Sequence, residues 1–297
     1  MREMWQPIGS VGNVEVARVH ELTFLGQTAS DFFPDFDREA VRAHEHWLCP
    51  EHFDPESLRI PMDVQSFVLK TDKHIIVVDT CCGNHKQRPG LPEFHRLTTG
   101  YLDRFNALGI TPEDVDFVMC THLHIDHIGW NTQLLGDRWV PTFPNARYVV
   151  SAQEYANAEQ EARDIPFEPV RNGFNDSILP IMDAGLCDLV SDDHEMLGML
   201  RLRPAPGHTV ANVQIELSSQ GQKAIFAGDM LHTPMQIPFW NWSSKLCHDP
   251  VQAAATRRRL FEQCIEENAL LVPGHFRAPH AGRIRDQDGG FQLVWGW

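Results

Sequence analysis

The sequence lacks the features of membrane, secreted and nucleic-acid-binding proteins. No stretch approaches the roughly 18 consecutive apolar residues of a transmembrane helix, and the start of the chain has Glu3 and Pro7 instead of the apolar run of a secretory signal. Basic residues are scarce, since 25 Lys and Arg stand against 40 Asp and Glu, a formal net charge of -15. Because this charge repels phosphate backbones and anionic bilayers, we expect neither nucleic acid nor a membrane as a partner.

Cysteine usage excludes two further classes. The seven cysteines are odd in number and show no Cys-x-x-Cys spacing, which argues against a disulfide framework and against a zinc ribbon. We expect reduced, buried cysteines and a cytoplasmic location. With 42% apolar and 22% charged residues, the chain can build a sizeable core, so wholesale disorder is excluded.

Strands and helices alternate along the chain, with no linker, repeat or low-complexity tract between them. Thr111 followed by Pro112 is typical of a helix start, and the stretch 75–79 is apolar enough for a central strand of a hairpin. The run 257–259, three arginines, is expected on a solvated helix face. We predict strands at 64–69, 75–79, 115–120, 147–150, 213–217, 224–227 and 270–272, and helices at 99–108, 152–162 and 250–268. This alternation favours an α/β fold whose sheets are covered by helices on their outer faces.

Two aromatic segments do not fit the alternation. Residues 31–57 carry several aromatic side chains among prolines and charges, which indicates a lid, an oligomer contact, or a surface loop with its own small core. Residues 233–247 pose the same choice, and we interpret them as a pocket wall. Its Phe239, Trp240 and Trp242 offer π-faces to a neutral substrate with an apolar part.

The segment 121–131, THLHIDHIGWN, follows the apolar strand VDFVMC. Residues at the exit of a buried strand are fixed in position and open to solvent, as a metal site requires. His122 and His124 project from the same side of an extended segment, whereas Asp126 and His127 turn away towards a second ion. Imidazole and carboxylate at these spacings suit zinc or another borderline divalent ion.

Three further positions supply ligand-type residues after glycine. His208 lies in a Pro/Gly turn before a strand, Asp229 ends the strand KAIFAGD, and His275 ends the strand LLVPGH. Together with the first segment they make five His and two Asp. This set is enough for two ions if Asp229 bridges them.

The pattern resembles the metallo-β-lactamase superfamily from about Asp63 to the C-terminus. The resemblance implies an αββα sandwich of two mixed β-sheets with helices on the outer faces, in which residues 1–297 form one domain and 31–57 a lid or oligomer contact. It implies His122, His124 and His208 on one metal, Asp126, His127 and His275 on the other, Asp229 between both, and Asp79 supporting the site from behind its ligands.

Single positions narrow the activity that the resemblance implies. His124 stands where redox-active diiron members carry Glu, and Asp229 stands where class B1 lactamases carry Cys. The sequence around the motifs is most similar to the sequences of the N-acyl homoserine lactonases and the methyl parathion hydrolase group. Many quorum-quenching lactonases carry a Tyr where this chain has His232, so His232 is expected to serve as hydrogen-bond donor or proton shuttle.

The expected function is therefore a dinuclear metal-dependent hydrolase that cleaves a lactone or related carboxylic ester by attack of a metal-bridging hydroxide. Asp126 would take up a proton as the intermediate collapses, with His232 as the second catalytic side chain. The metals are expected to be two Zn²⁺ ions, with Mn²⁺, Fe²⁺ or Co²⁺ as alternatives. The alternative functions are a phosphotriesterase of the methyl parathion hydrolase type, a thioesterase, and a non-catalytic metal-binding scaffold. A small-molecule substrate and a homodimer are expected.

Overall fold

The computed structural model describes residues 5–287 and 289–297, and the chain divides into two compact units. Unit 1 is Met1–Leu22 with Val64–His194, and unit 2 is Thr23–Asp63 with Glu195–Trp297. The long strands β2 (Val14–Thr28) and β3 (Arg59–Lys70) each contribute residues to both units. One domain over the whole chain stays a prediction.

The first mixed sheet has seven strands in the order β1-β2-β3-β4-β5-β8-β9. Its remaining strands are β1 (Gly9–Val11), β4 (Ile75–Val78), β5 (Phe117–Met119), β8 (Arg147–Ser151) and β9 (Cys187–Val190). The antiparallel pairing of β3 with β4 confirms the predicted hairpin, and β4, β5, β8 and β9 run parallel. Because β4 is the fourth of the seven strands, its apolar sequence is buried in the middle of the sheet, as predicted.

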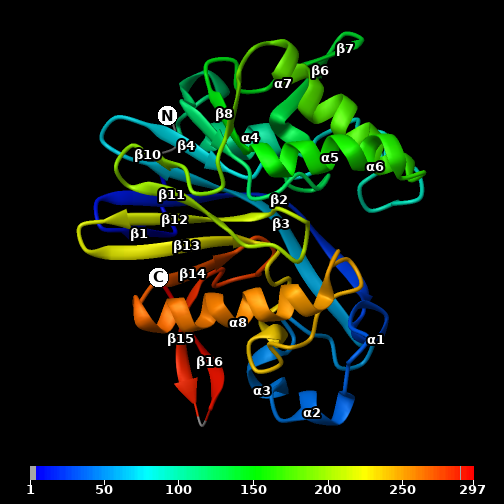
Figure 1. Ribbon diagram of the computed structural model, residues 1–297, viewed down its shortest axis with the longest axis vertical. Helices are drawn as coiled ribbons and strands as arrows, with labels where there is room; N and C mark the ends of the chain where they lie inside the picture. The colour runs from blue at the N-terminus through cyan, green and yellow to red at the C-terminus, as the bar shows by residue number, and fades with distance from the viewer. Residues whose placement is uncertain (1–4, 288) are drawn as a thin grey trace. The chain divides into compact units, whose positions relative to one another are not determined.

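Helices follow the strands of unit 1 (Figure 1). The predicted helices at 99–108 and 152–162 are confirmed as α4 (Tyr101–Ala107) and α5 (Ala152–Asp164). Thr111 starts the short helix η1 (Pro112–Asp114) with a capping box that involves Asp114. The other elements of unit 1 are η2 (Gly129–Asn131), β6 (Thr132–Leu135), β7 (Arg138–Pro141), α6 (Glu168–Gly173), the π-helical turn η3 (Phe174–Ile178) and α7 (Leu179–Asp183).

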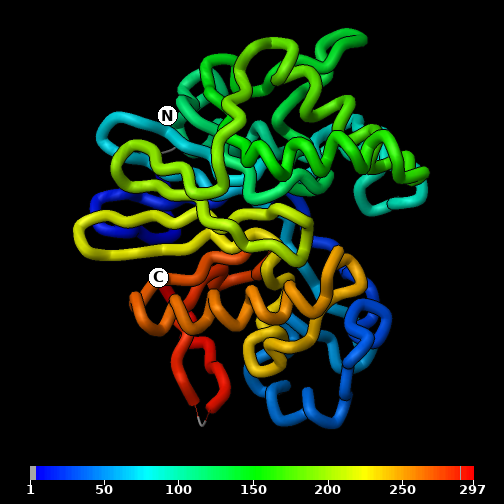
Figure 2. The backbone as a smooth tube through the Cα atoms, viewed as in Figure 1, coloured from blue at the N-terminus to red at the C-terminus, as the bar shows by residue number. Residues whose placement is uncertain are grey.

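The second mixed sheet follows the chain from β10 to β16 without a change of order. Its strands are β10 (Glu195–Met196), β11 (Leu200–Pro204), β12 (Val213–Ser219), β13 (Gln222–Gly228), β14 (Leu270–Pro273), β15 (Gly282–Gln287) and β16 (Gly290–Trp295). Only β13 and β14 pair in parallel, and β15 and β16 form the hairpin at the red end of the trace in Figure 2. The crossover between β13 and β14 contains η4 (Pro234–Gln236) and the long helix α8 (Pro250–Glu266).

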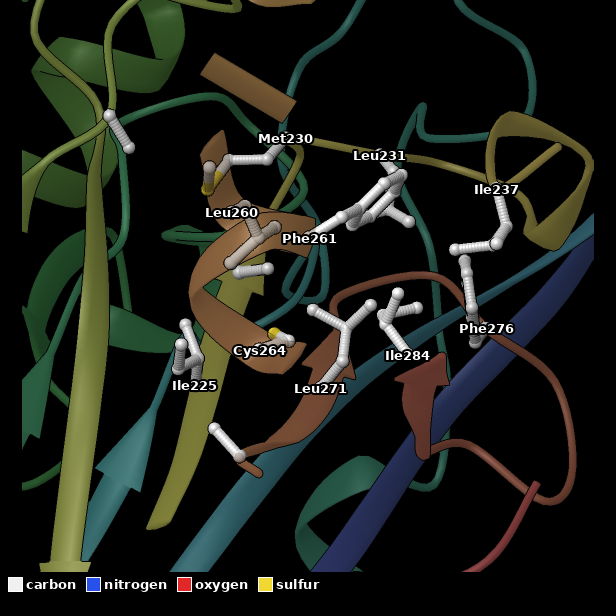
Figure 3. Close-up of a cluster of buried hydrophobic side chains, with 13 residues drawn as sticks. Ile225, Met230, Leu231, Ile237, Leu260, Phe261, Cys264, Leu271, Phe276 and Ile284 are labelled. Carbon is white, nitrogen blue, oxygen red and sulfur yellow. The ribbon is translucent and has the colours of Figure 1, made fainter. Parts of the chain in front are cut away.

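Helix α8 covers a core of unit 2, which Figure 3 shows from close by. Leu260, Phe261 and Cys264 are buried in this core, and Ile265 is partly buried against it, so the predicted apolar face of the helix is confirmed. Asp249 caps α8 and Pro250 occupies its first turn, the usual signals of a helix start. The residues after β13, Met230 and Leu231, lie in the same core.

The aromatic segment 31–57 builds a second small core in unit 2. It begins in the last turn of α1 (Ala29–Phe32) and contains α2 (Arg38–Arg42) and α3 (Glu45–Leu48). The buried members of this core are Ala29, Phe32, Phe33, Val41, Leu48, Phe53, Ile60, Met62, Met235 and Trp242. The segment is therefore a loop with its own core, one of the three alternatives, while a role as lid or oligomer contact stays a prediction.

One sequence expectation is wrong. The arginine run 257–259 does not lie on a solvated face as a whole, because Arg257 is fully buried while Arg258 and Arg259 are exposed. The helical period explains this, since Arg257 follows Ala253 by four residues and precedes Leu260 by three, both on the buried side of α8.

All seven cysteines are free, but the expectation that they are buried holds for only four of them. Cys49, Cys187 and Cys247 are half-buried. Across the described residues, no helix combines the length and the apolar character that crossing a membrane requires.

Candidate metal centre

In unit 1, the loop after β4 is paired with the loop that carries the histidine motif. The amide of Thr80 donates to the His127 carbonyl at 2.6 Å, the amide of Gly129 to the Cys81 carbonyl at 2.6 Å, and the amide of Trp130 to the Thr80 carbonyl at 2.7 Å. A Cβ atom at Gly129 would lie 1.8 Å from the Cys82 carbonyl oxygen, so this close approach requires glycine. The pairing fixes the backbone of the motif.

Asp79 joins the two loops through its carboxylate. It accepts hydrogen bonds from the Thr121 amide at 2.8 Å and the Thr121 hydroxyl at 2.8 Å, and Nδ1 of His127 lies 3.0 Å from its Oδ2. A carboxylate only accepts, so Nδ1 of His127 carries the proton and Nε2 is left as the ligand atom. Asp79 thus contacts one predicted ligand, and its support of a metal through that ligand stays a prediction.

Unit 1 brings the four predicted ligands of the motif together. The rings of His122 and His127 have centroids 4.1 Å apart, and those of His122 and His124 4.7 Å. Nε2 of His127 lies 3.9 Å from Oδ2 of Asp126, and Nδ1 of His122 lies 3.1 Å from the Thr121 hydroxyl. His122 and His127 are buried, whereas His124 and Asp126 are half-buried.

In unit 2, three imidazoles surround the buried carboxylate of Asp229, which follows β13. Nε2 of His275 lies 3.0 Å from Oδ1, and Nε2 of His208 and of His232 each lie 3.3 Å from Oδ2. The sequence had predicted His208, Asp229 and His275 as ligands that meet. It had not predicted that His232, the expected substrate donor, contacts the same carboxylate.

His232 is enclosed by rings. Its ring is parallel to that of His275 at 6.0 Å, and it meets the rings of His208 and Phe32 edge-on at 5.1 Å each. Only 2% of its surface is exposed, and Nδ1 has no hydrogen-bond partner in the described part of the chain. A buried imidazole nitrogen of this kind is available to an incoming donor or acceptor.

Backbone contacts hold the other two histidines of unit 2. Nδ1 of His275 lies 2.8 Å from the Asp63 carbonyl oxygen, and the Asp63 amide donates back to the His275 carbonyl. Gly207, with a φ of 135°, brings the turn before His208 so close to α8 that a Cβ atom there would lie 2.3 Å from the Ala253 nitrogen. The amide of His248 donates to the His208 carbonyl at 2.9 Å, so the start of α8 positions this turn.

The three aromatic residues of the predicted pocket wall occupy different surroundings. Trp242 is buried in the core that the segment 31–57 builds, and Phe239 stacks on it with a centroid distance of 4.1 Å and an interplanar angle of 11°. Trp240 is half-buried, and the Arg258 guanidinium lies 5.2 Å from its ring centroid. Contact of these residues with a substrate stays a prediction.

Two supporting residues were missed because no local pattern marks them. Glu21, on β2, accepts hydrogen bonds from the Cys82 amide and the Trp130 indole, each at 2.6 Å, and so fastens both paired loops of unit 1. Burial raises the pKa of the Glu21 carboxyl. Arg257 donates to three carbonyl groups near Asp229 in unit 2. Both depend on contacts between residues far apart in the sequence.

Comparison with known proteins gives one family and a set of related lactonases. Residues 59–275 match the Metallo-beta-lactamase superfamily. An N-acyl homoserine lactonase of Bacillus sp. is 23% identical over 57% of this chain, and one of Bacillus cereus is 22% identical over 72%. The matched region spans 58% of the length of the first relative and 81% of the second.

Two solved structures are similar over nearly the whole chain. The hydrolase AbOPH of the beta-lactamase superfamily has a TM-score of 0.78 at 21% identity, covering 99% of this chain and 97% of its own. AidC, a dizinc quorum-quenching lactonase in complex with a product, has a TM-score of 0.77 at 19% identity, covering 96% and 95%. With the family match, these likenesses confirm the predicted α/β fold class of two mixed sheets with helices.

Proposed function

Because this chain belongs to the metallo-β-lactamase superfamily of metal-dependent hydrolases, we propose that it is a dinuclear hydrolase that cleaves a lactone or a related carboxylic ester. The observation that carries the proposal is the pair of predicted ligand sets, four residues of one motif in unit 1 and His208, Asp229 and His275 in unit 2. The family match spans residues 59–275, which include all seven predicted ligands, and this supports the proposal that they hold metal, with Asp229 as the predicted bridge.

The donor chemistry fits divalent ions. The oxygen contacts at Nδ1 of His127 and His275, from Asp79 and the Asp63 carbonyl, direct Nε2 of each ring towards the site. All seven predicted ligands are nitrogen or carboxylate donors of the type that zinc binds. Such ions would supply Lewis-acid polarisation of the scissile carbonyl and a water of near-neutral pKa as nucleophile.

The chain's own residues would then orient the substrate and move the proton. His232 would donate from a ring nitrogen to the substrate oxygen, since its buried ring lies beside Asp229. Asp126 is half-buried, and so its carboxylate is accessible enough to accept the proton that the leaving group later receives. Phe239, Trp240 and Trp242 would line the apolar part of the substrate site.

A phosphotriesterase is the second candidate. It is favoured by His232, which stands where many lactonases carry Tyr, because the ring N–H of histidine is a shorter-reaching donor than the hydroxyl of tyrosine and would meet a substrate oxygen at a different position. The same ligands would act on phosphorus instead of carbon.

The proposal also includes the identity of the metal, the oligomeric state, the location and the substrate of the protein. Zinc as the native metal, a homodimer and a cytoplasmic location are retained as predictions. The lactonase relatives support a small-molecule lactone as substrate.

A substrate panel on one metal-analysed preparation tests the proposal. γ- and δ-lactones, aryl esters and paraoxon-type triesters are compared at equal concentration, and kcat/KM is measured for each. We expect the lactones or aryl esters to exceed the phosphotriesters. The reverse order would replace the proposal by the second candidate, and no hydrolysis of any class by metal-loaded protein would contradict both.

A further inference from the structure

Arg257 lies in the buried face of α8 without an acidic partner. Its side chain is fully buried, and no carboxylate lies within 4.0 Å of its guanidinium among the residues that the structure describes. A buried cation is costly unless hydrogen bonds compensate it. Burial lowers the pKa of Arg257 to about 10, so the group stays charged at neutral pH. Packing alone does not explain a charged residue at this position, because an apolar side chain would fill the same space without the cost of burying a charge.

The guanidinium instead binds three backbone carbonyl groups of one loop. Nε donates to the Met230 carbonyl at 2.7 Å, and Nη1 donates to the carbonyls of Trp240 at 2.6 Å and Trp242 at 2.9 Å. Met230 follows Asp229 directly, and its side chain is buried in the core with Leu260 and Phe261 (Figure 3). One planar group thus joins the first and last parts of the loop 229–242.

Gln236 closes the same loop from within. It is fully buried, its Oε1 accepts from the His232 amide at 2.7 Å, and its Nε2 donates to the Trp242 carbonyl at 2.9 Å. Trp242 is therefore the point at which the contacts of Gln236 and Arg257 meet. Through these two side chains, the backbone of the Asp229–His232 stretch is connected to that of Phe239–Trp242.

We propose that Arg257 is a positioning residue that sets the predicted metal bridge Asp229, the donor His232 and the aromatic wall Phe239–Trp242 in one fixed arrangement. The role of the loop in hydrolysis rests on the proposed function, but its ordering by Arg257 does not. A rigid fork that holds three acceptors at once is a property of guanidinium, because the ammonium of lysine is a point donor on a flexible stem. The aromatic wall and the ligand are thereby coupled.

Hydrogen exchange of the full-length, metal-loaded protein tests this role. In Arg257→Ala, we expect amides of residues 229–242 to exchange at least about ten-fold faster, because local opening loses charge-assisted bonds. The stretch 64–131 of unit 1 should not change. Arg259→Ala is the matched control, since it removes an exposed arginine of the same helix. Zinc affinity, measured by chelator competition, should fall about 10- to 100-fold only in Arg257→Ala.

Chemical rescue separates positioning from general packing. About 20 mM ethylguanidinium should restore slow exchange of 229–242 in Arg257→Ala, whereas ethylammonium should not, because only the planar fork reaches all three carbonyls. If Arg257→Ala does not fold, Arg257→Lys serves instead, and amides of 229–242 should exchange faster than in the wild type while those of 64–131 do not change. Unchanged exchange of the loop would overturn the proposal, as would faster exchange spread equally over α8 and β12–β14. Because the readout needs no substrate, a failed hydrolase assay leaves this test intact.

Discussion

The two units supply candidate ligands in opposite ways. Unit 1 takes four of them from seven consecutive residues, 121–127, at the end of β5. Unit 2 takes His208, Asp229 and His275 from three separate turns and fastens the loop of Asp229 to a helix that follows it in the chain. The conformation of a single loop places the residues of a contiguous motif. Residues from separate turns come together only when the strands and helices that carry those turns pack against one another.

The supporting groups also differ in charge. In unit 1 a carboxylate, Asp79, contacts the predicted ligand His127 at its ring nitrogen. In unit 2 a cation, Arg257, instead binds backbone carbonyl groups, one of them in the residue after the predicted ligand Asp229. The difference teaches that a supporting group can act on the ring of a predicted ligand, as Asp79 does, or on the backbone beside one, as Arg257 does.

The largest expected effect comes from removing one ligand in each unit. His122→Ala and His208→Ala should each lower kcat/KM by at least about 1000-fold, since each removes an inner ligand of the proposed centre, a loss of roughly 4 kcal/mol of transition-state stabilisation. His85→Ala and His46→Ala, at exposed positions of the same units, should stay near wild type. If only one of the two variants lost activity, the other histidine would not be a ligand of the proposed centre.

The second-largest expected effect is a difference between the two units in how acid changes their free energy of unfolding. Burial lowers the pKa of His52 in unit 2 to about 4, from 6.5, and its ring stacks on Trp295 at 5.0 Å. As the pH falls from 6.5 to 4, the unfolded chain binds a proton that the folded chain does not, so the free energy of unfolding should fall by up to about 3 kcal/mol. Glu21 in unit 1 acts in the opposite direction, because its raised pKa adds stability as the pH falls.

His52→Phe should remove the acid sensitivity of unit 2 without removing the stack on Trp295. Urea unfolding between pH 7 and 4.5 measures this, with the exposed His46→Phe as control. An identical loss of stability in His52→Phe and wild type would mean that another group carries the acid effect.

Asp79→Asn should weaken metal binding without abolishing it. The amide keeps a hydrogen bond to Thr121 but loses the negative charge that orients His127, so zinc affinity should fall about 10- to 100-fold. Chelator competition measures this, and Asp72→Asn in an exposed turn is the matched control. Equal affinities of wild type and Asp79→Asn would remove the distinction between the two kinds of support.

The smallest expected effect lies on the exposed face of α8. Arg258 donates to Glu262 at 2.9 Å, with both side chains more than half exposed. Glu262→Gln should cost less than about 1 kcal/mol of unfolding free energy, because solvent screens an exposed ion pair. A larger loss in thermal or urea unfolding would show that the exposed Arg258–Glu262 pair contributes more to stability than a solvent-screened ion pair should.

Features marked by a pattern of neighbouring residues could be predicted from the sequence, whereas contacts between residues far apart in the chain could not. The β3–β4 hairpin, α5 and α8 lie in continuous patterns, so periodicity predicted them, and the spacing within 122–127 predicted side chains that the structure brings together. Arg257 was misplaced because its neighbours are arginines, although the apolar period of α8 includes its position. Glu21 acts on Cys82 and Trp130, which are more than 60 residues further along the chain, so no spacing could identify it. The contact between Phe32 and the ring of His232 could not be predicted either, because these two residues are also far apart in the sequence.

Metal content, measured on the preparation that hydrolyses a lactone, tests the central claim most directly. If the protein is a dinuclear hydrolase, we expect about two divalent ions per chain, loss of both ions and of activity on chelation, and return of activity when zinc, manganese or cobalt is added. Well under one ion per chain, with no esterase activity after loading by any of these metals, would contradict it.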